Sequence, residues 1–422
     1  MTTGNALNAK PNAGNQHMRL DEGDAAPAAT PGREPPLCKK RLFCVDLLRG
    51  IDIFFLLVVN YGLLLGGFFK VWPLTSTWAK VLWTHSYTAF QSEPGAVTTG
   101  FGFFDFAQPL FIFVTGVSAS LAFSKFDSPN VFDAKAFWKR LACRTLMLWA
   151  VGSAIRGALT FKLFTGSGTQ QNFCLYSDTL HTIAVAYFAA SVGMLLRRAG
   201  LRAVLGFALV SVAAVVMFVY GDYSRHGNAA RLIEEAVYSR IGGKAKDFCY
   251  LLTTFTWSGM GILASLMGDV LKSDRAPWRK AGIIAMCGAG ALVSGWVLSF
   301  WVPPIRFVYT VSFVFETLGL STLLLAALYV LTDILGARRG TWVLILFGQC
   351  SMAAWVITQF FSSSLTDAAN CFVRGIPRLI GTDAYQPIFV AVARAALLVW
   401  LLWQWRRLRS CRSAKEALPS RL

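Results

Sequence analysis

Residues 41–62 read RLFCVDLLRGIDIFFLLVVNYG. The run is long enough to cross a bilayer as a helix, because about twenty mostly apolar residues span the hydrocarbon core. It nevertheless carries Asp46, Arg49, Asp52 and Asn60. Charged groups are costly in hydrocarbon, so such residues usually face a protein interior or a water-filled cavity. The stretch therefore predicts a first transmembrane helix with one face directed into a bundle.

The composition indicates that the rest of the chain also lies largely in a membrane. Of the 422 residues 55% are apolar and only 15% are charged, and long apolar runs recur along almost the whole length. This is typical of a polytopic membrane protein, so we expect an all-α fold without a soluble domain. The net charge of +18 does not indicate a nucleic-acid partner, because the basic residues form short clusters between apolar runs. The expected partner is the lipid bilayer.

Apolar runs predict about ten transmembrane helices. Their approximate limits are 44–65, 103–124, 141–160, 179–196, 203–221, 250–271, 281–302, 308–332, 342–361 and 386–405. Residues 1–40 are rich in Asn, Ala, Gly and Pro without apolar periodicity, which predicts a disordered tail. The transmembrane domain is expected over 41–408, followed by a basic tail over 409–422.

Basic residues gather before the first predicted span and after every second one. The clusters are Lys39, Lys40 and Arg41; Lys125, Lys135, Lys139 and Arg140; Arg197, Arg198 and Arg202; Lys272, Arg275, Arg279 and Lys280; Arg338 and Arg339; and Arg406, Arg407, Arg409 and Arg412. All of them fall on one side of the predicted topology. The positive-inside rule makes that side the cytoplasm, with both termini cytoplasmic. The outward connections are then near 66–102, 161–178, 222–249, 303–307 and 362–385.

The polar residues of the first span share one face if the span is an α-helix. At about 100° per residue, Asp46, Arg49, Asp52 and Asn60 fall within an arc of roughly 120°. Arg49 is three residues from both Asp46 and Asp52, a spacing at which helix side chains can pair. For Asp46 and Arg49, a purely structural ion pair is an equal alternative to a substrate site. Asn60 lies roughly 16 Å beyond Arg49, toward the outward end.

Polar residues at the outward ends of other segments indicate proton transfer. His85 lies in the first outward loop, Asp105 and Gln108 open the second span, and His181 opens the fourth span with Asp178. Imidazole titrates near neutral pH, and a carboxylate can fix its tautomer. Each residue also has a structural interpretation: Asp178 as a helix cap, His181 as a hydrogen-bonded packing residue and His85 as an interfacial loop residue.

Cysteine usage and short motifs exclude several other kinds of site. Of the nine cysteines, Cys174, Cys249 and Cys371 are predicted to face outward, where one disulfide among them is compatible with the topology but no pair is determined. No Cys-x-x-Cys or His-rich spacing indicates a metal site. Neither a Walker-type glycine loop nor a Rossmann fingerprint is present, so we expect no soluble cofactor domain.

The opening segment resembles the first span of the heparan-α-glucosaminide N-acetyltransferase family and its bacterial relatives, whose pattern is Arg, Asp, Arg-Gly and then Asn-Tyr-Gly. The similarity continues with a His-Ser pair at 85–86 and with FFDFAQPLFIFVTGVSAS, TLHTIAVAYF, WSGMGILASLMGDVL and PPIRFVYTVSFVFETLG. It covers nearly all of the chain after residue 40. The ordered set of motifs is more specific than Arg-Gly alone.

The resemblance implies transmembrane acyl transfer from acetyl-CoA, on the cytoplasmic side, to a sugar or polysaccharide on the far side. His85 and Asn60 match the family's catalytic His and Asn, and they would act as general base or acyl carrier and as oxyanion donor. Asp105 is expected to orient an imidazole. Arg49, with Asp46 beside it, is expected to attract the CoA phosphates. The resemblance also implies a multi-pass protein of a bacterial cytoplasmic (inner) membrane.

The chain departs from the family pattern on the acceptor side. Ile305-Arg306 stands where the family has Asn-Lys, and His181 stands where it has Gln. We keep Arg306 and His181 as substrate-binding candidates, although the planar guanidinium of Arg306 is not equivalent to an ammonium. His85 and Asp105 are twenty residues apart, about ten more than in the family, because QSEPGAVTTG is an apparent insertion. The insertion would reshape the acceptor site.

A proton-coupled transporter of a sugar, lipid or drug is the alternative function. Buried Asp, Asn and His groups would then form a proton relay. A membrane scaffold is a third interpretation, but it leaves the convergence of polar groups unexplained. The sequence does not determine the acceptor, the acyl chain length, ping-pong or direct transfer, or whether the protein is a homodimer.

Overall fold

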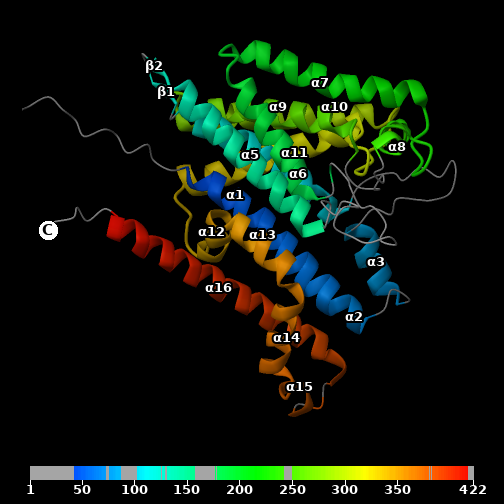
Figure 1. The fold of residues 1–422 in the computed structure, drawn as a ribbon, viewed down its shortest axis with the longest axis vertical. Helices are drawn as coiled ribbons and strands as arrows, with labels where there is room; N and C mark the ends of the chain where they lie inside the picture. Colours follow the sequence, from blue (N-terminus) through cyan, green and yellow to red (C-terminus); the bar gives the residue numbers. More distant parts are fainter. Residues whose placement is uncertain are drawn as a thin grey trace, which may run out of the picture. The chain divides into compact units, whose positions relative to one another are not determined.

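A computed structural model describes residues 42–72, 76–86, 102–124, 126–128, 131–156, 176, 178–241, 250–379, 381 and 383–416. Leu42–Leu422 forms one compact unit. The described part is helical apart from a hairpin of two short strands, β1 (Asp127–Ser128) and β2 (Val131–Phe132) (Figure 1). The predicted tail 1–40 lies outside the described residues. The predicted tail 409–422 begins inside the last helix.

The first predicted span is a single helical rod of three parts, α1 (Phe43–Phe54), the π-helix η1 (Phe55–Phe68) and α2 (Phe69–Val71). The elements that follow are α3 (Thr77–Ser86), the 3₁₀ helix η2 (Phe103–Phe106), α4 (Ala107–Phe123), α5 (Ala134–Arg156), α6 (Thr179–Gly193), α7 (Ala199–Tyr220), α8 (Ala229–Ile241), α9 (Thr253–Lys272), α10 (Pro277–Leu298), α11 (Val311–Tyr329), the π-helix η3 (Val330–Ile334), α12 (Trp342–Gln349), α13 (Ser351–Phe360), α14 (Ser362–Val373), α15 (Ile376–Leu379), the 3₁₀ helix η4 (Asp383–Tyr385) and α16 (Gln386–Glu416).

Six helical segments of the described chain are long and apolar enough to cross a membrane. They are Phe43–Val71, Phe103–Phe123, Ala199–Tyr220, Pro277–Leu298, Val311–Ile334 and Asp383–Arg409. A seventh span results if α12 and α13, which meet at a bend of 79°, are counted together. Helices α5, α6 and α9 occupy the other three predicted positions without meeting the same test. The membrane character is therefore supported, whereas the predicted count of about ten spans is not confirmed.

The α1–η1 rod lies between two groups of helices (Figure 1). On one side it contacts α4 and α11, which pack with α9, α10, α6 and α7. On the other side it contacts α12 and α16. The contact with α12 is close, because Gly50 and Gly348 leave no side chain between the two backbones. The first span is thus the element to which both groups attach.

A distant carboxylate caps the start of the first span. Asp333 in η3 accepts hydrogen bonds from the backbone N–H groups of Phe43, at 3.3 Å, and Cys44, at 2.9 Å. Thr332 donates to the same carboxylate at 2.9 Å. The residue at the N-cap position, Leu42, has no capping side chain. Asp333 therefore satisfies N–H groups that every helix leaves open in its first turn.

An ion network joins α4, α7 and α9. Asp269 pairs with Arg202, pairs with Lys272 at 2.9 Å and accepts a hydrogen bond from Ser120 at 2.7 Å. Two of the basic residues that predict the cytoplasmic side, Arg202 and Lys272, thus also bind helices together.

Candidate functional site

The charged residues of α1 form one of the two predicted ion pairs. Arg49 forms an ion pair with Asp46 at 3.6 Å, which confirms that predicted pair, and donates a hydrogen bond to Ser118 on α4 at 2.5 Å. The predicted pair of Arg49 with Asp52 is wrong. Asp52 is 2% exposed, and neither of its carboxylate oxygens has a hydrogen-bond partner among the described residues.

Asn60 is buried, at 5% exposure, but it lies in η1 and not in an α-helix. A π-helix has i→i+5 hydrogen bonds, so each residue turns through a smaller angle than in an α-helix. The common arc calculated for Asp46, Arg49, Asp52 and Asn60 therefore does not extend past Phe54. The role of Asn60 as an oxyanion donor stays a prediction.

Asp105 and Arg306, which are 201 residues apart in sequence, form an ion pair at 2.5 Å. Asp105 is 1% exposed, and its other carboxylate oxygen accepts a hydrogen bond from the backbone N–H of Gly102 at 2.9 Å. Arg306 is held in a turn in which Thr310 donates to the carbonyl of Pro303 at 2.8 Å. The structure thus brings together two predicted site residues, in a pairing that the sequence did not indicate.

His181 is fully buried and hydrogen-bonded at both ring nitrogens. Its Nδ1 accepts the backbone N–H of Asp178 at 3.1 Å, and its Nε2 lies 3.0 Å from the Ser153 hydroxyl. An Nδ1 that accepts leaves the ring proton of a neutral imidazole on Nε2. These bonds match the interpretation of His181 as a packing residue that closes the first turn of α6.

His85 lies near the end of helix α3, not in a loop as predicted. Its side chain is outside the described part of the chain, so its predicted role as a base stays a prediction. The helix that carries it contacts η2, which holds Asp105. The α4 and α6 ends are also joined, because Gln108 donates to Thr182 at 3.3 Å. The outward ends predicted for these segments therefore lie close together.

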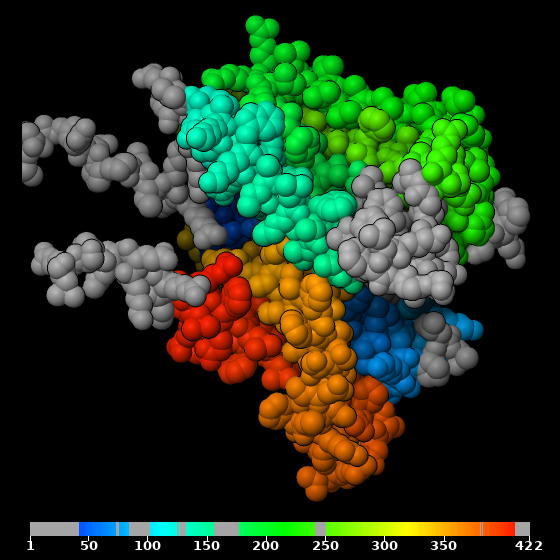
Figure 2. Space-filling model, viewed as in Figure 1, coloured from blue at the N-terminus to red at the C-terminus, as the bar shows by residue number. Residues whose placement is uncertain are grey.

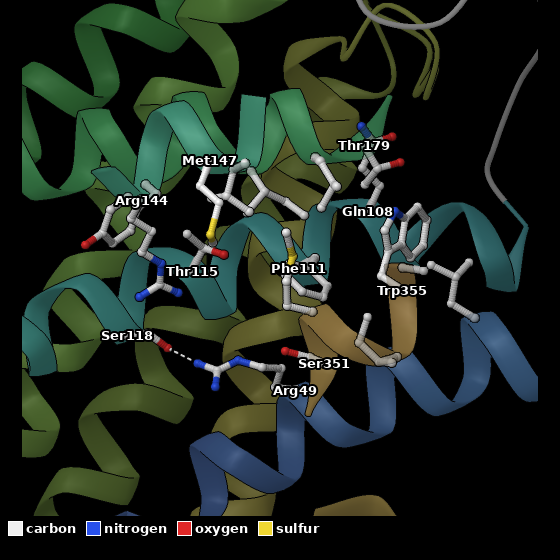
Figure 3. Close-up of a pocket in the computed structure, with 18 residues that line it drawn as sticks. Arg49, Gln108, Phe111, Thr115, Ser118, Arg144, Met147, Thr179, Ser351 and Trp355 are labelled. Carbon is white, nitrogen blue, oxygen red and sulfur yellow. Dashed lines mark hydrogen bonds between the residues drawn. The ribbon is translucent and has the colours of Figure 1, made fainter. Parts of the chain in front are cut away.

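A cavity of about 230 Å³ lies between α1, η1, α4, α5, α6 and α13 (Figure 3). Arg49, Ser118 and Arg144 line one end, and Gln108, Thr179 and Trp355 line the other. Along α4 the lining extends from Ser118 to Ala107, roughly 16 Å at the rise of an α-helix. Figure 2 shows α5 and α13 next to each other on the surface of the molecule. The two helices contact each other, and both contribute residues to the wall of the cavity.

The charge of the cavity is concentrated at the end near Arg49 and Arg144. None of its described lining residues is acidic, and Arg144 lies over the ring of Tyr187 at 4.5 Å. Helix α13 begins at this end with Ser351, so the positive end of its dipole adds to the two guanidinium groups. Most of the wall between the two ends is apolar, from residues such as Ile53, Phe111, Leu148 and Ile183. The arrangement suits an elongated ligand with an anionic group at one end.

Sequence reasoning missed Arg144 and Trp355 in this cavity. An arginine inside an apolar run was the signal that drew attention to Arg49, and Arg144 in the predicted span 141–160 carries the same signal. No comparable signal in the sequence marks Trp355, because tryptophan is common in apolar membrane helices. His181 and Arg306, predicted to bind substrate, do not line the cavity.

The described residues include no group of three His, Cys, Asp or Glu side chains that could hold a metal ion. Cys371 is an exposed free thiol, while Cys174 and Cys249 lie outside the described residues. No model of a known protein family matches the chain, and no curated protein matches it. The fold and the site define a helical integral membrane protein with a cavity inside its bundle.

Proposed function

We propose that the protein is a transmembrane acyltransferase that moves an acetyl or longer acyl group from cytoplasmic acyl-CoA to a sugar or glycan on the other side of a bacterial inner membrane. The observation that carries the proposal is the cavity. Its lining has two arginines at one end and no acidic residue, while Asp46 pairs with Arg49 from outside the lining. The cavity leads toward the segments that bear Asp105 and His181 at the other end. The motif resemblance supports the same reaction.

The cavity suits the parts of an acyl-CoA in order. Arg49 and Arg144 would bind phosphate oxygens, because guanidinium groups pair well with phosphates. The apolar middle of the cavity would hold the pantetheine arm, and the thioester would lie beyond Gln108. The basic clusters support a cytoplasmic position for the arginine end and for both termini.

The proposed transfer uses one base. His85 takes the proton of the acceptor hydroxyl or amine as its oxygen or nitrogen attacks the thioester carbonyl carbon. The new carbon–oxygen or carbon–nitrogen bond forms as the carbon–sulfur bond breaks, and the CoA thiolate leaves with the bonding electrons and takes the proton back from the imidazolium. Asn60 would donate a hydrogen bond to the transient oxyanion.

A binding and transfer experiment tests this function. Purified protein in lipid nanodiscs is incubated with radiolabelled acetyl-CoA, with and without a panel of amino sugars and envelope glycans. We expect acetyl-CoA to bind, acceptor-dependent release of CoA, and binding weakened roughly tenfold or more by Arg49→Ala or Arg144→Ala. Arg279→Ala, an exposed arginine of α10 in another predicted cytoplasmic cluster, is the control. Failure of every acyl-CoA to bind the wild-type protein would refute the proposal.

A proton-coupled transporter is the second candidate, and two observations favour it. The span of α12 and α13 is broken by 79° beside the cavity, and broken helices are common at transport sites. Asp52 is a buried carboxyl without a described partner, as in proton-carrying spans. This function predicts pH-driven uptake into vesicles that Asp52→Asn abolishes. The acyltransferase predicts acyl-CoA turnover that Asp52→Asn leaves largely intact.

A further inference from the structure

Gln108 presents an amide at the end of the cavity opposite the two arginines. Its side chain lines the cavity, and Figure 3 shows it at the same end as Thr179 and Trp355. The wall that separates this end from Arg49 and Arg144 is largely apolar. In a mostly apolar pocket, a few polar groups fix the orientation of the ligand. The position of this amide therefore indicates where the ligand has a polar group.

The Thr182 hydroxyl determines which way the Gln108 amide points. Thr182 donates its single hydroxyl proton to the backbone carbonyl of Thr179 at 2.7 Å. Its oxygen can therefore only accept from Gln108, so the Gln108 Nε2 group lies toward Thr182, at 3.3 Å. The Gln108 side chain makes no other hydrogen bond within the described chain. Its carbonyl oxygen and its second N–H are left to a ligand.

We propose that Gln108 pairs with an amide of the pantetheine arm of the acyl donor and so selects donors that carry this arm. The inference rests on the proposed function and assigns it a specificity-determining residue. An amide is the group that matches both free positions of Gln108, because its N–H donates to Oε1 and its carbonyl accepts from Nε2. A fatty acyl chain offers neither group, and a lipid ester offers only acceptors.

The position of Gln108 fits the length of that arm. Gln108 and Ser118 are ten residues apart on α4, roughly 15 Å along the helix axis. Ser118 holds Arg49, so this distance separates the phosphate-binding end from the amide. The arm connects the nucleotide phosphates to the thioester and has its amide bonds between them. A ligand anchored by its phosphates at the arginines would therefore place an amide at Gln108 and the thioester beyond it.

Three ligands separate the contribution of the arm from that of the phosphates. Affinities of wild-type protein and Gln108→Leu are measured for acetyl-CoA, for CoA and for adenosine 3′,5′-bisphosphate, which has phosphates but no arm. We expect Gln108→Leu to weaken acetyl-CoA and CoA about fivefold, the factor of an ordinary neutral hydrogen bond, and to leave the bisphosphate unchanged. Arg144→Ala is expected to weaken all three. Gln108→Asn, which keeps the amide but retracts it, should give the pattern of Gln108→Leu.

Gln386→Leu is the matched control. Gln386 also donates one hydrogen bond, to Asn370 at 2.9 Å, but it does not line the cavity, so no affinity should change. If Gln108→Leu and Gln108→Asn bind all three ligands like the wild type, the inference is overturned while acyl-CoA transfer stands. If Gln108→Leu weakens binding of the bisphosphate as much as binding of CoA, Gln108 does not recognise the pantetheine arm. The inference is then also overturned. If the wild-type protein binds none of the three, the proposed function itself fails.

Discussion

Gly50 on α1 and Gly348 on α12 lie against each other with no side chain between them. A Cβ built on Gly50 would be 3.1 Å from the backbone nitrogen of Gly348 and would overlap the carbonyl oxygen of Leu344. A Cβ on Gly348 would overlap the carbonyl oxygen of Asp46. Small residues allow membrane helices to approach this closely, and here the approach places Arg49 beside the start of α13.

The first prediction concerns this contact. Gly50→Ala or Gly348→Ala should separate α1 from α12 and lower the melting temperature strongly, because backbone atoms cannot move aside as a flexible side chain can. Thermal unfolding in detergent measures the effect. Gly290→Ala on α10 is the control, since nothing lies within 4 Å of its added Cβ, and alanine favours a helix by about 1 kcal/mol. Equal melting temperatures for all three variants would contradict the close contact.

The second prediction concerns the cap on the first span. Asp333→Ala should remove the acceptor for the N–H groups of Phe43 and Cys44 and cost about 0.5–2 kcal/mol of stability. Asp333→Asn keeps one acceptor oxygen and should recover part of the loss. Thermal unfolding of both variants is compared with that of Asp274→Ala, an exposed aspartate between α9 and α10. A loss no larger than that of the control would show that the cap does not stabilise the helix.

The third prediction separates the roles of His85 and His181. His181→Ala should lower stability by about 1–3 kcal/mol, because it leaves the Ser153 hydroxyl and the Asp178 N–H without their buried partner. His85→Ala should leave stability nearly unchanged and slow acyl transfer by about 10²–10⁴, as expected for loss of a general base. Unfolding and turnover are measured on the same preparations.

His226→Ala, in a predicted outward loop, is the control for both measurements, because His226 is exposed. Normal turnover of His85→Ala together with an inactive but stable His181→Ala would move the base to α6. Full activity of both variants would show that neither His85 nor His181 is the base, and the proposed chemistry would be wrong.

The fourth prediction concerns orientation. Cys371 on α14 is an exposed free thiol in a connection that is predicted to face outward. In a variant whose other eight cysteines are replaced by serine, a membrane-impermeant maleimide should therefore label Cys371 in intact cells, and Cys371→Ser should remove that labelling. A single cysteine introduced as Asp274→Cys into a protein without its nine native cysteines, on the predicted cytoplasmic side, should react only after the cells are opened. The reverse pattern would invert the topology and place the arginine end of the cavity outside.

Each of the ten predicted runs contains a helix in the structure, because apolar runs of this length are visible in the sequence, whereas the count of about ten spans is not confirmed. The first span, the burial of Asp46, Asp52 and Asn60, and the Asp46–Arg49 pair follow from local spacing. The π-helix over Phe55–Phe68 does not, since an apolar run looks the same whichever hydrogen-bond pattern it adopts. The bend at Cys350 is hidden for the same reason, because no proline marks it.

The site was harder to predict than the helices, because its contacts join distant segments. Asp105 and Arg306 were each candidates, yet only the tertiary structure shows that they pair. The cavity forms where the α1–η1 rod meets α4, α5, α6 and α13, which are separated in the sequence. A single sequence does not show which of its helices pack against one another. Arg144 could have been found by the reasoning applied to Arg49. Trp355 could not.

The cap on α1 also has a consequence for biosynthesis. Asp333 is 290 residues from Phe43, so the first helix leaves the ribosome long before its capping residue exists. At 5–20 residues per second this interval lasts roughly 15 to 60 s. Until then water, lipid headgroups or the insertion machinery must satisfy the first N–H groups of α1. Nascent chains that end before Asp333 will therefore hold their first helix by a different set of contacts from the finished protein.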